Sequence, residues 1–355
     1  MTALVTTITE TMRYKGAIGQ WSWVLHRITG LGVVLFVTLH IVDTSWALFY
    51  PELYVHAIAS YQTPIFTIGE FFLVACVVYH AYNGIRIAVM DFRPKMWHSQ
   101  RKAAYWVLGL TVITLIPVFI LMFGHVLNFY GESSPLLGLG DVIAAQLPFV
   151  AGIAVAIIAA LVFSAIVGLF VRQPKDRRRH RSNAERFWWS FMRVSGLIIL
   201  PLVFGHLAMM HVLQGVFDLT AQGATIVGAP GAINSTGTAV EFVATRWNFF
   251  VAGVAIWRVY DFLLLTLVVL HGFNGLRYVL TDYTMKSPLL RRAAVYVSVI
   301  GAVVLLTLGG AALIGTIPQA SIDAAEEATQ HLIEQAGLAP QEAEAEPAAA
   351  ATTAP

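Results

Sequence analysis

The sequence predicts an all-α protein: a polytopic transmembrane helical bundle of about seven spans, in which two three-helix repeats are joined by a connector helix. Of the 355 residues, 57% are hydrophobic and only 12% are charged, whereas soluble domains carry roughly 25% charged residues. In addition, a motif that holds a histidine, an Asn-Gly pair and an arginine occurs once in each half of the chain. The composition excludes a soluble globular protein, and the repeated motif predicts two related units.

Seven stretches are each long and apolar enough to cross about 30 Å of hydrocarbon as a helix. They carry few charged residues and alternate with segments that are richer in Lys, Arg, Pro and Gly. In chain order, the predicted spans are 24–49, 65–90, 103–128, 147–171, 194–217, 253–280 and 293–317.

Basic residues predict the orientation of these spans, because loops rich in Lys and Arg are retained in the cytoplasm. With the N-terminus inside, the outer half keeps only Arg246 and Arg258. We therefore expect a multi-pass protein of the inner (cytoplasmic) membrane, embedded in the lipid bilayer, with its N-terminus in the cytoplasm and its C-terminus outside. Topology accounts for the basic residues, so they do not indicate nucleic-acid binding. The cytoplasmic segments contain Arg93, Lys95, Arg101, Lys102, the run 172–193, Lys286, Arg291 and Arg292.

The chain repeats itself in the first span of each unit. Residues 26–30 (His-Arg-Ile-Thr-Gly), followed by His40, align with residues 192–196 (Met-Arg-Val-Ser-Gly), followed by His206. Each unit thus places a histidine at the same position of its first span, and the histidine at position 26 has no counterpart in the second unit.

The second spans share the pattern H-x-x-N-G-[IL]-R-x-x-x-x-D-[FY], which begins at His80 and again at His271. Because each unit has three spans, a second copy that runs in the same direction needs an additional crossing between the units. The span 147–171, which lacks charged residues and histidine, supplies this connector and is expected to face lipid. An ordered cap or flexible loop is expected over 218–250. The predicted divisions are a first unit 1–130, a connector helix and basic loop 131–184, a second unit 185–317, and a disordered acidic tail 318–355.

Four histidines at repeat-matched positions carry the functional prediction. One intramembrane histidine alone is often a hydrogen-bonded helix contact, but two matched pairs indicate iron held between facing helices, as in a bis-histidine haem. His80 and His271 lie roughly 9 Å along the helix from the arginine of their motif, whereas His40 and His206 lie roughly 20 Å from theirs. We predict one haem b nearer the cytoplasm, on His80 and His271, and one nearer the outer face, on His40 and His206. His211, on the same span as His206, is the rival ligand.

Other polar residues near these histidines have two interpretations each. The cytoplasmic-end residues His26, Arg27, Arg86 and Arg277 fit haem propionates through charge-assisted hydrogen bonds, and simple anchoring at the membrane surface is the alternative for the arginines. Arg258 and Asp261 are expected to pair on one helix, unless Arg258 meets propionates of the outer haem. Glu70 is either a proton relay or a water-exposed helix end. The single cysteine, Cys76, excludes an intrachain disulfide and a Cys-ligated cluster within this chain.

Three other classes of membrane protein share parts of this pattern. The cytochrome b of bc-type complexes carries two ligand histidines on each of two helices, which His26 and His40 imitate but Met192 breaks in the second unit. A transporter also combines repeats with polar residues at mid-membrane depth, yet the polar residues here are mostly imidazoles. A hydrogenase- or formate-dehydrogenase-type cytochrome b stays open on chemistry alone.

The motifs resemble those of one respiratory family. Residues 22–30 (Ser-Trp-Val-Leu-His-Arg-Ile-Thr-Gly), with Tyr79-His80 and the motif that ends at Asp91-Phe92, resemble the C subunit of succinate dehydrogenase. Residues 270–283 resemble its D subunit. The chain therefore resembles a fused C and D membrane anchor of respiratory complex II, of the two-haem type.

The resemblance implies a function that spacing alone does not show. Family members dock an iron–sulfur subunit and, through it, a flavoprotein subunit at the cytoplasmic face, and they pass electrons from succinate to quinone. This chain is then part of an enzyme, with succinate oxidation located in other subunits. Fumarate reduction, the anchor of another quinone-linked dehydrogenase, and a haem-poor anchor with a docking role only are the alternatives.

The resemblance also implies the quinone site. The family's arginine and tyrosine correspond to Arg27 and Tyr283, with Asp282 adjacent. Trp23 stands where single-haem relatives place a quinone-contacting serine, and Ser22 lies one residue early. Because the two-haem members commonly use menaquinone, menaquinone is expected in preference to ubiquinone, with a second quinone site near Glu70 as a further expectation.

Overall fold

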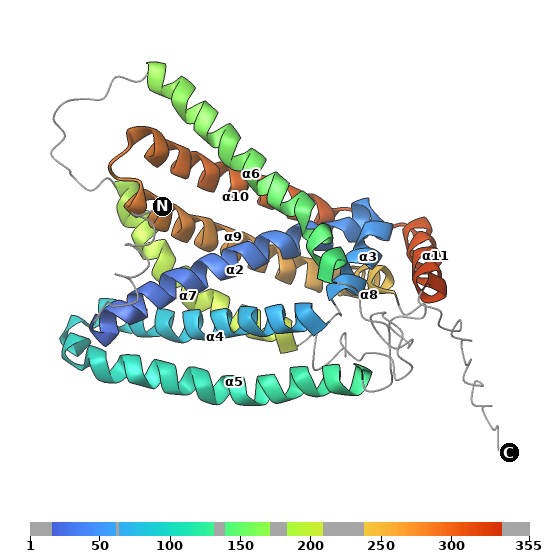
Figure 1. Cartoon of the computed structure of the whole chain (residues 1–355), viewed down its shortest axis with the longest axis horizontal. Helices are drawn as coiled ribbons and strands as arrows, with labels where there is room; N and C mark the ends of the chain where they lie inside the picture. The colour runs from blue at the N-terminus through green and yellow to red at the C-terminus, as the bar shows by residue number, and fades with distance from the viewer. Residues whose placement is uncertain (1–15, 62–63, 131–138, 171–182, 209–237, 336–355) are drawn as a thin grey trace.

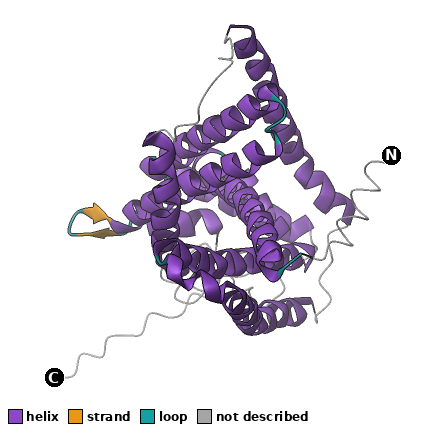
Figure 2. Ribbon diagram, turned by 90° about the vertical axis from the view of Figure 1, so that its left-hand side faces the viewer, coloured by secondary structure: helices purple, strands orange, loops and turns teal. Residues whose placement is uncertain are grey.

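The computed structural model describes residues 16–61, 64–130, 139–170, 183–208 and 238–335, and these form a bundle of long helices with one small hairpin (Figures 1 and 2). The predicted all-α, polytopic class is confirmed. In chain order, the elements are α2 (Ile18–Phe49), α3 (Pro51–Tyr61), α4 (Pro64–Phe92), η1 (Pro94–Ser99), α5 (Gln100–Tyr130), α6 (Leu139–Phe170), α7 (Asn183–Ala208), α8 (Ala239–Trp247), β1 (Phe250–Val251), β2 (Val254–Ala255), α9 (Ile256–Tyr283), α10 (Pro288–Ile314) and α11 (Gln319–Gln335).

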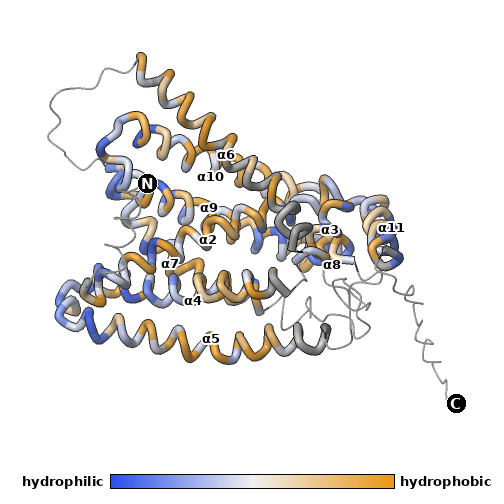
Figure 3. The backbone as a smooth tube through the Cα atoms, viewed as in Figure 1, coloured by the Kyte–Doolittle hydropathy of each residue, from blue (hydrophilic) through white to orange (hydrophobic). Residues whose placement is uncertain are grey.

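The long helices have the composition of membrane spans. Within the described residues, six helices are long and apolar enough to cross a bilayer: α2, α4, α5, α7, α9 and α10. The seventh long helix, α6, has 32 residues, and its described apolar part covers Ile157–Ile166. Large apolar side chains are exposed along the middle of the bundle, for example Ile113 of α5 at 66% exposure, and Figure 3 shows polar residues gathered at the helix ends. An apolar exterior of this extent fits lipid and not water.

Four helices form the centre of the bundle. Helix α2 packs against α4 and α9, and α7 packs against the same two helices, so that the four make a closed ring. Helix α5 covers α4, and α10 covers α9 and α2. The first two helices of each predicted unit thus lie in the ring, and the third helix of each unit lies outside it.

Helix α6 lies at the edge of the bundle beside α10 (Figure 1). Ser164 is fully buried against α10, and its hydroxyl donates to the backbone carbonyl of Leu289 at 2.6 Å. Most described side chains on the rest of α6 are exposed, as the prediction of a lipid-facing connector requires. One face of α6 therefore holds it to α10, and the remainder is left for lipid.

The two ends of the bundle differ. One end carries Arg27, Arg93, Arg193 and Lys286, and we call it the basic end. At the other end, the short helices α3, α8 and α11 pack against one another, and we call them the cap (Figure 1). Their shared core includes Tyr54, Val240, Phe242, Trp247 and Ala325.

The prediction that the tail is disordered from residue 318 is wrong for residues 319–335, which form α11. The prediction assumed that a segment poor in large apolar residues has too little surface to bury. In α11, small residues recur at helical spacing instead, with Ala325, Ala328 and Thr329 buried and Ile322 and Leu332 packed beside them. Small side chains let α11 approach α3 and α8 closely, so less apolar surface suffices. Residues 336–355 lie outside the described residues.

The segment predicted as a cap or loop over 218–250 is described only from residue 238 onward. There it forms α8, whose N-terminus is capped by the Thr238 hydroxyl accepting from the Glu241 amide at 3.2 Å. Strands β1 and β2 follow as a hairpin whose two turn residues, Ala252 and Gly253, have φ of 50° and 80°. Two positive φ values are what a tight two-residue hairpin of type I′ requires.

A buried carboxyl joins the cap to the bundle. The Tyr61 hydroxyl at the end of α3 donates to Asp43 Oδ2 in α2, and Asp43 is buried. Burial, together with the Asp43 carboxyl, raises the pKa of the Tyr61 hydroxyl, so Tyr61 stays a donor throughout the physiological pH range. The other carboxyl oxygen of Asp43 has no hydrogen-bond partner among the described residues.

We expect Tyr61→Phe to destabilise the protein, because it removes the donor and leaves a buried carboxyl unsatisfied. The expected loss is about 1–3 kcal/mol, measured as a lower melting temperature in detergent. Tyr50→Phe is the matched control, since Tyr50 is exposed. Equal melting temperatures for the two variants would show that the Asp43–Tyr61 contact does not stabilise the cap.

Candidate functional site

The structure brings both predicted histidine pairs together inside the helix ring. The rings of His80 (α4) and His271 (α9) have centroids 6.5 Å apart and planes at 86°. Those of His40 (α2) and His206 (α7) are 6.2 Å apart, with planes at 81°. An imidazole nitrogen binds a metal ion at about 2 Å, so two imidazoles on opposite sides of one iron have centroids roughly 6 Å apart. Both pairs fit that spacing.

Hydrogen bonds orient the first pair. Ser195 donates its hydroxyl to the carbonyl of Phe191 at 2.6 Å, so its oxygen accepts from His271 Nδ1 at 2.9 Å. His80 Nδ1 lies 3.1 Å from the carbonyl of His26, which only accepts. Both rings are therefore protonated on Nδ1, and both Nε2 lone pairs stay available for a metal. Ser195 was not among the residues predicted from the sequence, although the repeated Thr-Gly and Ser-Gly pairs mark its position.

Glycines make room for these two imidazoles. A Cβ atom on Gly30 would lie 2.9 Å from His80 Cε1, and one on Gly196 would lie 3.2 Å from His271 Cε1. Gly30 and Gly196 occupy the same place in the repeat. Each unit therefore uses a glycine of its first helix to seat the histidine of its second helix.

Buried donors without partners surround the first pair on its basic-end side. Arg86 Nε and Nη1, Arg277 Nη2, Asn274 Nδ2 and His26 Nδ1 are buried and make no hydrogen bond among the described residues. The His26 ring stacks on His80, with centroids 3.9 Å apart. Buried guanidinium groups require acceptors, and the two carboxylates of a haem would supply them through charge-assisted bonds. The residues present fit the group.

The second pair lies toward the cap and has a charged neighbour. Asp261 Oδ1 lies 3.5 Å from His206 Nδ1 and accepts from Arg246 Nη2 at 2.8 Å, while Oδ2 accepts from the Trp247 indole at 3.3 Å. His40 keeps accessible surface, although its ring lies beside those of Phe36 and His206. The rival ligand His211 lies outside the described residues. Glu70, in the second turn of α4, is half-buried.

The expected pairing of Arg258 with Asp261 is wrong. Arg258 donates instead to the carbonyls of Trp247, Leu313 and Gly315 at 2.8–3.0 Å and to Asn248 Oδ1 at 2.9 Å. The last carbonyls of a helix have no partner within it. The carbonyls at the C-terminus of α10 therefore bind the Arg258 guanidinium in place of Asp261, which lies on the same helix as Arg258. Arg246, which the sequence analysis assigned no role, takes the carboxylate.

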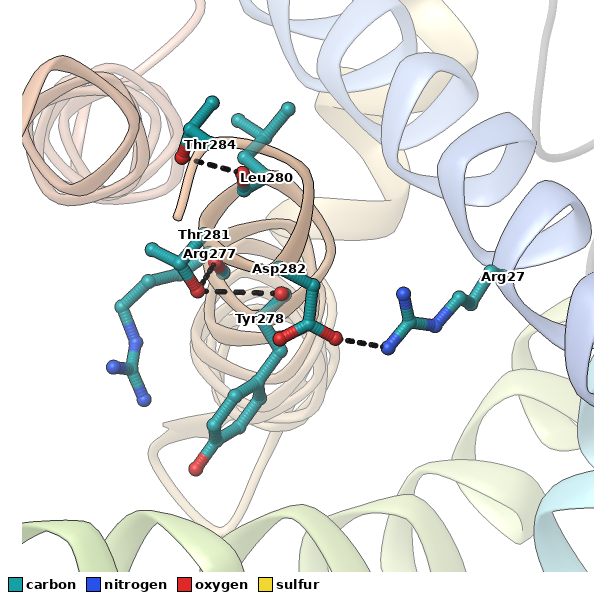
Figure 4. Close-up of polar contacts among 7 residues, drawn as sticks. All are labelled: Arg27, Arg277, Tyr278, Leu280, Thr281, Asp282 and Thr284. Atoms are coloured by element: carbon teal, nitrogen blue, oxygen red, sulfur yellow. Dashed lines mark hydrogen bonds and ion pairs between the residues drawn. The ribbon is translucent and has the colours of Figure 1, made fainter. Parts of the chain in front are cut away.

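A second cluster lies at the basic end, where helices α2 and α9 meet. Arg27 forms an ion pair with Asp282, and Figure 4 shows its guanidinium reaching across to that carboxylate. The guanidinium carbon also lies 3.8 Å from the centre of the Trp23 ring and 5.9 Å from that of Tyr283. Tyr283 is 73% exposed, so the cluster presents a phenol, a guanidinium and an indole at one surface.

Ser22 does not join that cluster. It is 3% exposed, and its hydroxyl lies 3.1 Å from the Tyr79 hydroxyl and donates to Asn83 Oδ1 at 2.8 Å. Ser22 thus holds α2 to α4, whereas the Trp23 indole contacts Arg27. Asn83, the asparagine of the repeated motif, is fully buried by this contact.

The other half of the ring repeats the Arg27 arrangement. Arg193 pairs with Asp91 at 2.7 Å, and its guanidinium carbon lies 3.8 Å from the centre of the Trp189 ring. The residue after Asp91 is Phe92, where the residue after Asp282 is a tyrosine. Each arginine pairs with an aspartate of the other unit, so the two ion pairs cross between the halves of the chain.

Comparison with known proteins identifies the family of the chain. The sequence matches the model of the succinate dehydrogenase/fumarate reductase transmembrane subunit family over residues 7–121 and 172–309. The chain belongs to this family. It is 38% identical over 103 residues to the succinate dehydrogenase 2 membrane subunit SdhC of Mycobacterium tuberculosis, covering 29% of this chain and 75% of that protein. It is 31% identical over 106 residues to the succinate dehydrogenase hydrophobic membrane anchor subunit of Halobacterium salinarum, covering 29% and 81%. No solved structure matches significantly.

Membership of the succinate dehydrogenase/fumarate reductase family defines the role of the chain at a coarse level. It is a multi-pass membrane-anchor subunit of an enzyme complex, it associates with the other subunits of that complex, and the catalysis of succinate chemistry lies in those subunits. The predicted family is confirmed.

Proposed function

We propose that this anchor is a dihaem cytochrome b that passes electrons from an iron–sulfur subunit to quinone. The observation that supports the proposal is that four histidines form two pairs. Each pair joins two facing helices, with ring centroids 6.5 and 6.2 Å apart. His80 and His271 hold the haem nearer the basic end, and His40 and His206 hold the haem nearer the cap. Each haem would supply one-electron redox chemistry. The histidines hold the iron, and Arg86, Arg277 and His26 bind the propionates.

The quinone is proposed to bind at the basic-end cluster. Arg27 and the Tyr283 phenol donate hydrogen bonds to a quinone carbonyl and stabilise the negative charge that develops on reduction. Asp282 holds the guanidinium in place, and the guanidinium lies over the Trp23 indole. Because the chain has two ligand pairs, as two-haem family members do, menaquinone is proposed in preference to ubiquinone.

The proposed partners dock at the same end. The basic end faces the cytoplasm by the distribution of Lys and Arg, so the iron–sulfur subunit and, through it, the flavoprotein subunit contact this surface. The cap then lies on the outer side. A quinone beside the docking surface receives electrons over a short distance from the iron–sulfur subunit.

Haem stoichiometry tests the proposal directly. A pyridine haemochrome assay on the purified complex, with quantified protein, is expected to give two b haems per chain. One haem per chain would refute the dihaem assignment. The absence of haem would overturn the proposal and leave a subunit that only docks its partners to the membrane.

We expect Arg27→Gln to lower quinone reductase activity by about 10²-fold, the cost of losing one donor to a developing oxyanion. Activity is measured with succinate and a soluble menaquinone analogue, and haem content is expected to be unchanged. Arg193→Gln is the matched control, because Arg193 has the same ion-pair and indole contacts without a neighbouring tyrosine. A similar fall in both variants would indicate loss of helix packing rather than loss of a quinone contact.

A further inference from the structure

We propose that Asp261 is a positioning residue for His206, and that Arg246 in the cap sets how much negative charge the cap-end haem experiences. This inference rests on the proposed function, because it assigns His206 to an iron. It assigns a role to the cap helix α8, which contains none of the four histidines.

The Asp261 carboxylate lies beside the ring nitrogen of His206 that would not bind iron. His206 Nδ1 is buried and makes no hydrogen bond among the described residues, and the atom that faces it is Asp261 Oδ1 at 3.5 Å. A carboxylate beside the non-coordinating nitrogen of a ligand histidine fixes the tautomer and orients the ring. Nε2 is then left free for the proposed iron, and the ring of His40 lies 6.2 Å away between centroids.

Residues of the cap helix α8 hold the Asp261 carboxylate in position. Asp261 accepts from Arg246 Nη2 at 2.8 Å and from the Trp247 indole at 3.3 Å, both in the last turn of α8. Arg246 is 4% exposed and its guanidinium carbon lies 4.6 Å from the centre of the Trp257 ring. Arg258 binds the carbonyl that ends α8, at Trp247. The guanidinium is therefore buried, the carboxylate is largely covered, and each partner has further contacts that hold it in place.

The other pair lacks such a charge at the same atoms. His80 Nδ1 meets a backbone carbonyl and His271 Nδ1 meets a hydroxyl, and both of these partners are neutral. Asp261 therefore distinguishes the surroundings of the two proposed irons. A negative charge stabilises the oxidised iron and lowers its reduction potential, and a positive charge acts in the opposite direction.

Variants that remove the negative or the positive charge are expected to shift the haem potential in opposite directions. A purely structural role of these residues predicts no such opposition. Asp261→Asn removes negative charge and is expected to raise the potential of the cap-end haem. Arg246→Gln leaves the carboxylate uncompensated and is expected to lower the same potential. Arg246→Lys keeps the charge and is expected to restore the wild-type value. The potential of the haem on His80 and His271 is expected to stay unchanged in all three.

Potentiometric titration of the intact complex, followed in the haem α band, measures both potentials, and electron paramagnetic resonance of the oxidised haems reports the orientation of the axial rings. Asp323→Asn is the control, because Asp323 is an exposed carboxylate in the cap helix α11. Shifts of opposite sign, confined to one haem, support the inference. Shifts of the same sign, no shift, or loss of both haems in Asp261→Asn overturn it. Absence of haem from the wild-type complex would refute the proposed function rather than this inference alone. The haemochrome assay tests for that outcome before the titrations.

Discussion

Replacing His271 by alanine is expected to halve the haem content of the purified complex, from two b haems per chain to one. His271 and His80 supply the two imidazoles of one proposed iron, and their Nδ1 atoms are already committed to other partners. A single remaining histidine leaves the iron five-coordinate at best, and the alanine opens a cavity behind it. The assay is pyridine haemochrome with quantified protein, together with the low-spin signal of the oxidised complex.

Two further variants complete this experiment. His40→Ala is expected to remove the other haem and to leave the one on His80 and His271. His56→Ala, at an exposed position of α3 outside the helix ring, is expected to keep both. Loss of both haems in His271→Ala alone, or retention of both, would contradict the assignment of the ligands to two separate pairs.

The second large effect is expected from a single methyl group. Gly30→Ala places a Cβ atom 2.9 Å from His80 Cε1 and 3.2 Å from its Nδ1. The ring has little freedom to retreat, because the His26 ring stacks on it and the His26 carbonyl binds its Nδ1. Overpacking of this kind costs about 1–3 kcal/mol, so the ligand moves and the haem on His80 is expected to be lost or to lose its low-spin signal.

The repeat supplies graded controls for this glycine. Gly196→Ala approaches His271 only to 3.2 Å and is expected to have a smaller effect. Gly109→Ala, in α5, meets no atom within 4 Å and is expected to have none. If haem content in Gly30→Ala equals that in Gly109→Ala, then the glycine does not seat the ligand, and its place in the repeat reflects helix packing alone.

The sequence predicted those parts of the molecule that depend on long-range periodicity. Spans are recognisable because hydrocarbon thickness fixes their length, and the histidine pairs were recognisable because the repeat aligns His80 with His271. The cluster of Arg27 with Asp282 came from resemblance to the family, and the structure places these residues in contact. None of these inferences required knowledge of side-chain packing.

The features that the sequence did not predict depend on which of several nearby groups a side chain contacts. Helix α11 is held by small buried residues that hydrophobicity does not distinguish from a solvated tail. Arg258 binds helix-end carbonyls in preference to the carboxylate of Asp261, one turn away on the same helix. Arg246 binds that carboxylate instead, and it lies on another helix, so helical spacing does not predict the contact. Ser22 was a candidate quinone contact because relatives have a serine one residue later, yet adjacent residues on a helix point to different faces, and Ser22 binds α4 instead.

The crossed ion pairs have a consequence for how the subunit assembles. Arg27 of the first half binds Asp282 of the second, and Arg193 of the second binds Asp91 of the first. Each half thus contributes one half of both contacts, and each histidine pair is likewise shared between the halves. Neither half contains a complete histidine pair, so the proposed haems are expected to insert only after both halves have entered the membrane. Joining both halves in one polypeptide fixes their ratio at one to one and makes their meeting independent of concentration.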